Sequence, residues 1–221
     1  MKLRTMVEFG TLGVAAIALV AVIPMASAAA VQNWQLGYYT PSGNALSNGS
    51  TLNSPTSGLA TFAFTSQPNT AVLFTDQGAY KGTLLGNDSG KTITATFTIA
   101  NATAGAFTYY GKPDGGSTPP SVRLFFTSLQ GPFAYTNYWW TDAAATVLAN
   151  GTFTLTATVD PATAWSDWNG QSSSANATAF TAAATNVTDI GLSFGGGFFF
   201  ENGVGTTDGS GTFTLTSFSV S

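Results

Sequence analysis

Two segments of the chain alternate strictly between threonine and apolar residues, and this pattern constrains the fold more than any other feature. Residues 92–99 read TITATFTI and residues 152–159 read TFTLTATV. Because successive side chains of a β-strand point to opposite faces, each segment predicts a strand with one apolar face and one threonine face. Strands of this kind bury the apolar side and leave the threonine side in solvent.

Further short segments with strand character are separated by stretches rich in glycine, proline and asparagine. They span residues 31–40, 59–64, 71–75, 107–110, 121–128, 187–194 and 211–220. In the segment 121–128, Val122, Leu124 and Phe126 are expected in the core, which leaves Arg123 and Phe125 on the opposite face. The number of short strands and turn signals predicts an all-β fold, a jelly-roll-like antiparallel β-sandwich.

Two segments depart from simple alternation. In the last segment the apolar phase changes between Leu215 and Phe218, which predicts a β-bulge at Thr216 and Ser217. Residues 176–185, NATAFTAAAT, fit either a short helix or a strand.

The first thirty residues have the pattern of a secretory signal peptide. Lys2 and Arg4 precede an apolar run over residues 12–23, and residues 26–28 form a small-residue cleavage site. The run is too short for a membrane anchor. We therefore expect a secreted protein (extracellular, periplasmic or on the cell surface) without a membrane span after cleavage. Residues 31–221 are expected to form a single β-sandwich domain. Residues 41–57 are interpreted as a long loop, or alternatively as a linker that makes residues 31–58 a loose N-terminal arm.

Composition excludes several kinds of chemistry. The chain has no cysteine and no histidine, which rules out Ser-His-Asp triads, histidine-ligated zinc and thiolate metal sites. Removing Lys2, Arg4 and Glu8 with the leader changes the formal net charge from −4 to −5, and this argues against a nucleic-acid partner. Glycoside hydrolysis usually needs two carboxyl groups. Glu201 is the one glutamate left, so a hydrolase pairing it with an aspartate is the weaker alternative to a protein that is not an enzyme.

The second half of the chain resembles a known group of folds. Residues 160–170 carry Trp165, Trp168 and Gly170, and they are followed by DIGLSFGGG at 189–197 and FTLTSFSV at 213–220. Over about residues 90–221 this pattern resembles galactose-binding-like jelly rolls, the fold of many carbohydrate-binding modules. It is also similar to secreted bacterial proteins of the exosortase-sorted kind, although their sorting tail is missing. The resemblance implies a sugar site of aromatic platforms with a few polar side chains, and a structural calcium ion in many members.

Aromatic residues near predicted turns are the candidates for binding carbohydrate, because sugar rings stack on exposed aromatic faces. Tyr138, Trp139 and Trp140 are adjacent, so Trp139 must point away from the other two. The alternative is that the tryptophans pack the ends of the sandwich. The predicted ligand-binding residues are Trp139, Trp165, Asp167, Trp168, Tyr109, Tyr110 and Arg123.

Metal binding and assembly are the remaining hypotheses. Asp76, Asp88 and Asp208 lie in predicted loops and are the candidate calcium ligands, although no EF-hand spacing supports them. No other cofactor is expected. As an alternative function, the sparse charge, the threonine faces and the terminal strand are consistent with a structural or adhesive protein that self-associates or docks to a cell-envelope partner.

Overall fold

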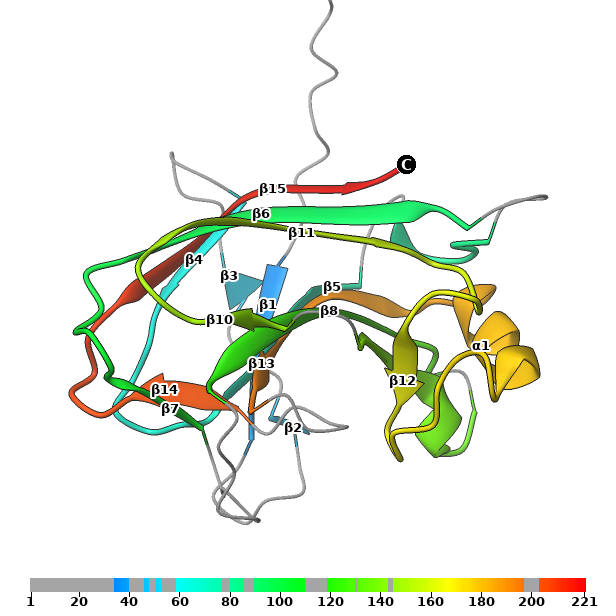
Figure 1. The fold of residues 1–221 in the computed structure, drawn as a ribbon, viewed down its shortest axis with the longest axis horizontal. Helices are drawn as coiled ribbons and strands as arrows, with labels where there is room; N and C mark the ends of the chain where they lie inside the picture. The colour runs from blue at the N-terminus through cyan, green and yellow to red at the C-terminus, as the bar shows by residue number, and fades with distance from the viewer. Residues whose placement is uncertain are drawn as a thin grey trace, which may run out of the picture.

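Two antiparallel sheets face each other in the computed structural model and form a jelly-roll-like β-sandwich (Figure 1). The predicted fold class is therefore confirmed. The described residues are 34–39, 46–47, 51–52, 59–76, 80–85, 90–109, 119–129, 131–142, 145–196 and 203–221. The predicted signal peptide, Tyr110 and Asp88 lie outside them. Across these ranges, no helix has both the length and the apolar character required to cross a membrane.

The smaller sheet has four strands and contains both threonine-alternating segments. Its order is β11 (Gly151–Thr158), β6 (Thr92–Ala100), β15 (Thr212–Val220) and β4 (Ala60–Ala63). The predicted alternation is confirmed, because Ile93, Ala95, Phe97 and Ile99 of β6 are buried while the threonines between them are half-buried. The predicted bulge is also confirmed, since the register of β15 against β6 shifts between residues 215 and 217.

The larger sheet has eleven strands among the described residues, several of them short (Figure 1). The order along its main path is β12 (Trp165–Asp167), β9 (Tyr138–Thr141), β8 (Ser121–Thr127), β13 (Asp189–Gly195), β5 (Thr70–Thr75), β1 (Trp34–Tyr39) and β2 (Leu46–Ser47). The short strands off this path are β3 (Thr51–Leu52), β7 (Phe107–Tyr109), β10 (Thr146–Val147) and β14 (Val204–Thr206). Between β1 and β8, the chain repeatedly crosses from one sheet to the other.

Helix α1 (Ala177–Ala184) covers one end of the sandwich (Figure 1). The sequence did not decide between helix and strand for this segment. Its alanines favour a helix, and burial of Phe180 in the core stabilises it. The helix contributes Phe180 to the core, where its ring centroid lies 5.0 Å from that of Trp139 and 5.6 Å from that of Phe126. A short 3-10 helix (Tyr135–Asn137) precedes β9 beside this end.

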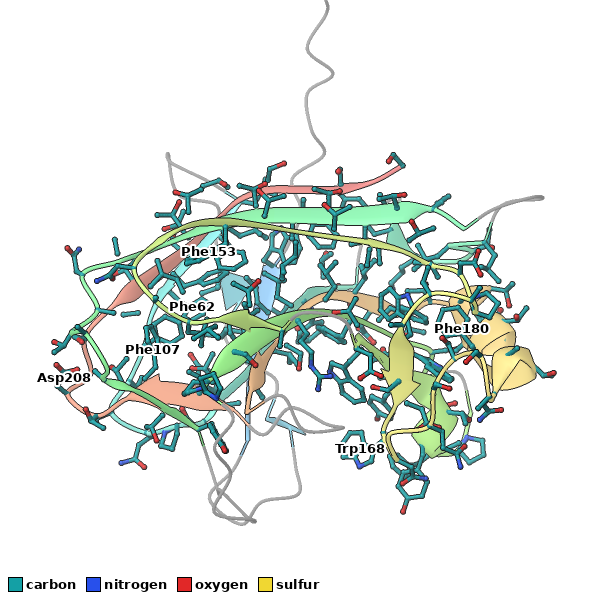
Figure 2. All side chains as sticks on the ribbon, viewed as in Figure 1. Phe62, Phe107, Phe153, Trp168, Phe180 and Asp208 are labelled. Carbon is teal, nitrogen blue, oxygen red and sulfur yellow. The ribbon has the colours of Figure 1, made fainter. Side chains whose placement is uncertain are left out.

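Aromatic rings fill the space between the sheets. The ring of Phe213 stacks on Phe97 at 4.9 Å and on Phe62 at 5.0 Å between centroids. Phe153 stacks on the other side of Phe97 at 5.5 Å, and Figure 2 shows Phe62, Phe107 and Phe153 between the sheets. Each buried phenylalanine contributes about 1.5–3 kcal/mol through removal of apolar surface from water. This core holds the strands in register without any disulfide.

Candidate functional site

Strand β9 sends its two tryptophans to opposite faces of the larger sheet. Trp139 is 0 % exposed and packs in the core between the sheets. Trp140 lies on the outer face in a separate group with Val72, Phe74 and Phe125. The predicted divergence of Trp139 from its neighbours is therefore confirmed, and the outward set is Tyr138 and Trp140.

Five aromatic side chains meet on and beside this outer face, and we call them the aromatic cluster. They are Phe133, Tyr135, Tyr138, Trp140 and Trp168. The centroid of Tyr138 lies 5.0 Å from that of Trp168, 5.8 Å from that of Phe133 and 6.2 Å from that of Trp140. Phe133 also contacts Tyr135 at 5.4 Å and Trp168 at 6.0 Å. Each ring thus touches at least one other, and the cluster is continuous.

The pairing of β12 with β9 brings the turn after β12, which carries Trp168, beside β9 and the segment before it. Asp167 of β12 pairs with Trp139 of β9, so Trp168 and Tyr138 follow as opposite neighbours on the outer face. The backbone N–H of Trp168 donates to the carbonyl of Tyr135 at 3.4 Å, which ties the turn after β12 to the segment before β9. In Figure 2, Trp168 lies beyond the larger sheet, near the end of the molecule that carries α1.

The surface of the cluster is accessible at its margin. Phe133 is 63 % exposed and Tyr135 is 47 % exposed. Tyr138 and Trp168 are half-buried, and Trp140 is buried behind them. Contiguous exposed apolar surface often marks an interaction or ligand-binding site. The exposed edge of the cluster is therefore the strongest candidate for a ligand-binding surface among the described residues.

Asp167 fixes the turn that carries Trp168. Its side chain is 1 % exposed, and its Oδ1 accepts hydrogen bonds from the backbone N–H groups of Asn169 and Gln171, both at 2.9 Å. Gly170 has a φ of 76°, a conformation that glycine adopts without steric cost. Asp167 therefore positions the aromatic cluster from beneath and does not line its exposed margin.

Polar groups also border the cluster. Asn169 and Gln171 are exposed in the same turn, and their amides can both donate and accept hydrogen bonds. Burial raises the pKa of the Tyr138 phenol above 10.0, and the carboxylate of Asp189 raises that pKa further. The Tyr138 hydroxyl therefore keeps its proton at neutral pH and can act as a donor.

Most of the other predicted ligand-binding residues lie in the interior. Trp139 and Trp165 have no exposed surface, and their indole N–H groups donate to the carbonyls of Thr136 at 2.8 Å and Thr158 at 2.9 Å. Tyr109 is buried as well. Arg123 is buried with its Nη1 4.0 Å from a carboxylate oxygen of Asp142. Of the predicted set that the structure describes, only Trp168 joins the cluster.

Sequence reasoning missed Phe133 and Tyr135 and did not choose Tyr138 or Trp140. The available signal was the density of aromatic residues in FAYTNYWW over residues 133–140. The alternation of β9 showed that one side of the strand would face outward, but it did not show which. That choice depends on the pairing of β9 with β8 and β12, which is a long-range property.

The predicted calcium ligands are not gathered in one place by the described residues. Asp208 is fully exposed at the end of the molecule opposite α1 (Figure 2). Hydrogen bonds from the side chains of Ser210 and Thr103 lower its pKa to about 2. Asp76 is partly buried. In the ranges that the structure describes, no three His, Cys, Asp or Glu side chains are grouped as a metal site, so calcium binding stays a prediction.

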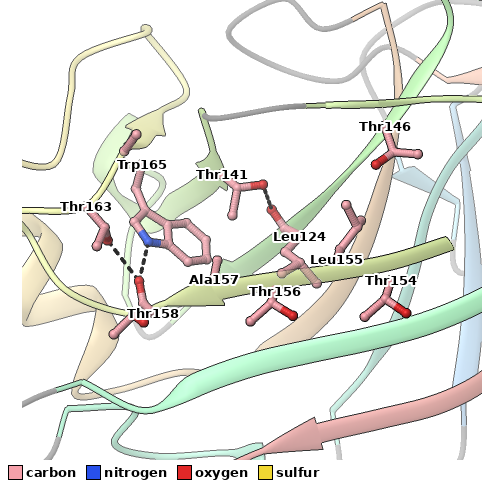
Figure 3. A pocket seen from close by; sticks show the side chains of 11 residues that line it. Leu124, Thr141, Thr146, Thr154, Leu155, Thr156, Ala157, Thr158, Thr163 and Trp165 are labelled. Carbon is pink, nitrogen blue, oxygen red and sulfur yellow. Dashed lines mark hydrogen bonds between the residues drawn. The ribbon is translucent and has the colours of Figure 1, made fainter.

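A groove of about 430 Å³ opens between β11 and the larger sheet (Figure 3). Its lining contains no ionisable side chain and consists of Leu124, Thr141, Thr146, residues 154–158, Thr163, Ala164 and Trp165. The close view shows the Trp165 indole and the Thr163 hydroxyl bonded to the Thr158 carbonyl at one end of the groove. The lining offers apolar surface and hydroxyl groups, without an acid or base for catalysis.

Comparison with known protein families, with curated proteins and with solved structures gives no match to this chain.

Proposed function

We propose that this protein is a secreted, non-catalytic carbohydrate-binding protein that recognises a polysaccharide through the aromatic cluster. The observation that carries the proposal is the exposed margin of five contiguous aromatic rings, with Phe133 and Tyr135 at its edge. The predicted signal peptide and the resemblance to carbohydrate-binding jelly rolls support the same reading.

The chemistry of the cluster suits a sugar. The C–H groups of a pyranose ring pack against an aromatic face, while its hydroxyls need planar polar partners at the edge. The rings of Tyr138 and Trp168 are inclined by 68° and those of Phe133 and Trp168 by 84°. Inclined rings can contact successive residues of a twisted glycan chain. Asn169, Gln171 and the Tyr138 hydroxyl are the nearby polar groups.

The two carboxylates nearest the cluster each accept hydrogen bonds through one oxygen, although the buried Oδ2 of Asp167 has no partner. These bonds hold both side chains in place, which favours a binding role over catalysis. Asp167 holds the turn through backbone N–H groups. Asp189 accepts hydrogen bonds from the hydroxyls of Thr127 and Thr188, both at 2.8 Å. Glycosidases need one free acid and one free base or nucleophile on either side of the scissile bond.

Affinity electrophoresis and pull-down with a panel of neutral polysaccharides test the proposal on the chain without residues 1–30. We expect Trp168→Ala and Phe133→Ala each to weaken binding by about tenfold or more, because a few aromatic contacts carry most of the binding energy in such interfaces. Thr154→Ala, on the opposite sheet, is the matched control and should bind as the wild type does. Retention of full affinity in both aromatic variants would remove this site, and failure to bind any glycan would remove the function.

A structural or adhesive role is the second candidate, and one observation favours it. The terminal strand β15 is paired with β6 along its length and with β4 over Thr212–Leu215. The Phe218 carbonyl of its second half accepts a hydrogen bond from the Tyr80 hydroxyl at 2.9 Å. The first half of the terminal strand is thus paired on both sides. The smaller sheet ends in β4 and β11, and β11, the longer of these two edge strands, is the better surface to receive a partner.

A further inference from the structure

Strand β11 has one paired side and one open side. All eight of its residues pair in unbroken register with β6. No strand of the described residues pairs with its other side, which borders the groove of Figure 3. An edge of this kind presents unpaired backbone donors and acceptors to any strand that approaches it.

The direction of the backbone groups follows from one hydrogen bond. The N–H of Val159 donates to the carbonyl of Lys91 at 2.9 Å, so Val159 belongs to the residues that face β6. Backbone groups of alternate residues point to opposite sides of an antiparallel strand. The N–H and C=O groups of Thr152, Thr154 and Thr156 therefore point toward the open side. The carbonyl of Thr158 points the same way and is already used by Trp165 and Thr163.

The edge lacks the features that usually prevent strand addition. Residues 151–158, GTFTLTAT, include no charged residue and no proline, and their pairing with β6 includes no bulge. The inner side chains Phe153 and Leu155 are only half-buried, whereas Phe97 of the neighbouring strand is fully buried. Apolar surface and backbone hydrogen-bonding groups are thus exposed along the same edge.

We propose that β11 is the self-association site of this protein and that it pairs antiparallel with β11 of a second copy about a two-fold axis. A two-fold interface must be self-complementary. An axis at Thr154 sets Thr152 opposite Thr156, so the three free threonines supply every backbone bond of the new ladder. The same axis sets Phe153 opposite Leu155 on the inner face.

The neighbouring register is less suitable. An axis at Leu155 would set Thr152 opposite Thr158, whose carbonyl already accepts three hydrogen bonds. The axis at Thr154 breaks none of the existing hydrogen bonds of Thr158. Neither β11 nor the lining of the adjoining groove carries a charged residue, so these surfaces bring no like charges together. The dimer would join the two smaller sheets into one continuous sheet and cover the half-buried inner side chains of both copies.

Sedimentation equilibrium of the chain without residues 1–30 tests this assignment from micromolar to submillimolar concentration. We expect a dimer for the wild type and for Thr154→Val, which keeps the backbone N–H, and a monomer for Thr154→Pro. Proline at this position removes only an outward N–H, and edge strands tolerate it there. A native circular dichroism spectrum for Thr154→Pro shows that its fold is retained. A monomeric wild type, or a dimer that survives Thr154→Pro, would overturn the proposal.

Disulfide cross-linking through one introduced cysteine gives a second test that needs no proline variant. It is specific because the natural chain contains no cysteine. Two residues in a hydrogen-bonded antiparallel pair have Cα atoms about 5.5 Å apart, within the range of a disulfide. Thr154→Cys should therefore form a cross-linked dimer under mild oxidation. Thr214→Cys, on the same face but inside the sheet, is the control and should stay monomeric. Equal cross-linking of both variants, or none at Thr154→Cys, would contradict the two-fold axis. The aromatic cluster lies on the other sheet, so this outcome is independent of carbohydrate binding.

Discussion

The outer faces of the two sheets are built from strands with similar inner faces and carry opposite chemistry. On the smaller sheet most of the outer positions are hydroxyl residues, and we call the following set the threonine face: Thr61, Thr94, Thr96, Thr98, Thr152, Thr154, Thr156, Thr214, Ser217 and Ser219. On the larger sheet the outer positions include Phe74, Phe125, Tyr138 and Trp140. The first face is uniform and uncharged, and the second is aromatic at one end.

The two faces also differ in how far their polar groups are hydrogen-bonded within the protein. On the threonine face the hydroxyls bond across strands, with Oγ1–Oγ1 distances of 3.0 Å between Thr96 and Thr154, 3.1 Å between Thr98 and Thr152, and 3.2 Å between Thr61 and Thr214. The aromatic cluster has no equivalent closure, because the Nε1 of Trp140 has no hydrogen-bond partner and Phe133 is exposed. The threonine face is therefore complete without a ligand, and the aromatic cluster offers surface to one.

The largest expected effect concerns the inner side of β9. Trp139→Ala should lower the free energy of unfolding by about 3–5 kcal/mol, because it leaves a cavity beside Phe180. Urea unfolding followed by circular dichroism measures the change. Thr96→Ala on the threonine face is the control, and a loss of equal size there would show that the two faces do not differ as described.

A smaller loss is expected at the turn beneath the aromatic cluster. Asp167→Ala removes the acceptor of two backbone N–H groups and should cost about 1–3 kcal/mol of unfolding free energy. It should also weaken polysaccharide binding, since Trp168 loses its support. Asp167→Asn keeps one acceptor oxygen, so its losses of unfolding free energy and of polysaccharide affinity should both be smaller. If Asp167→Ala reduced stability without any change in affinity, the turn would not position the site.

The threonine pairs are expected to contribute least to the free energy of unfolding. A double-mutant cycle with Thr96→Val and Thr154→Val should give a coupling of about 0.2–1 kcal/mol, the range of cross-strand pairs at exposed positions. Each free energy comes from urea unfolding, with the protein kept dilute so that association does not contribute. A coupling of several kcal/mol would mean that this face is more than a solvated surface.

The pH dependence of the unfolding free energy tests the burial of Tyr138 in the aromatic cluster. The pKa of Tyr138 is raised in the folded state by burial and by Asp189, so the neutral phenol stabilises the fold. This contribution is fully present below the unfolded value of about 10 and is lost as the pH rises through the folded pKa. Tyr138→Phe should therefore show a weaker decline of unfolding free energy above pH 10 than the wild type. An identical decline in both proteins would show that Tyr138 is not shielded within the cluster.

Local alternation determined much of the fold and could be read directly. The pattern in β6 and β11 and the phase change in β15 depend only on neighbouring residues, and the structure confirms both. Residues 177–184 were ambiguous because alanine and threonine fit either element there. Their helical state depends on Phe180 reaching a core made by distant strands.

The candidate site was harder to predict, because burial of an aromatic residue depends on which strands lie above it. Trp165 and Trp168 are close in sequence and were both expected at a sugar site, yet Trp165 enters the core and Trp168 lies on the outer side. The alternation of β12 separates residues 165 and 168, but only its pairing with β9 decides which side faces inward. Phe133 and Tyr135 belong to a loop, where no periodic pattern marks exposure.

Hydrogen–deuterium exchange with and without polysaccharide tests most directly whether the aromatic cluster is the ligand-binding face. The protein without residues 1–30 would be kept dilute, and exchange would be followed by mass spectrometry. We predict slower exchange in residues 131–142 and 165–171 when a bound polysaccharide is present, with no change in residues 92–98 and 152–158. Slower exchange confined to the threonine face, with residues 131–142 unaffected, would contradict the assignment of binding to the aromatic cluster.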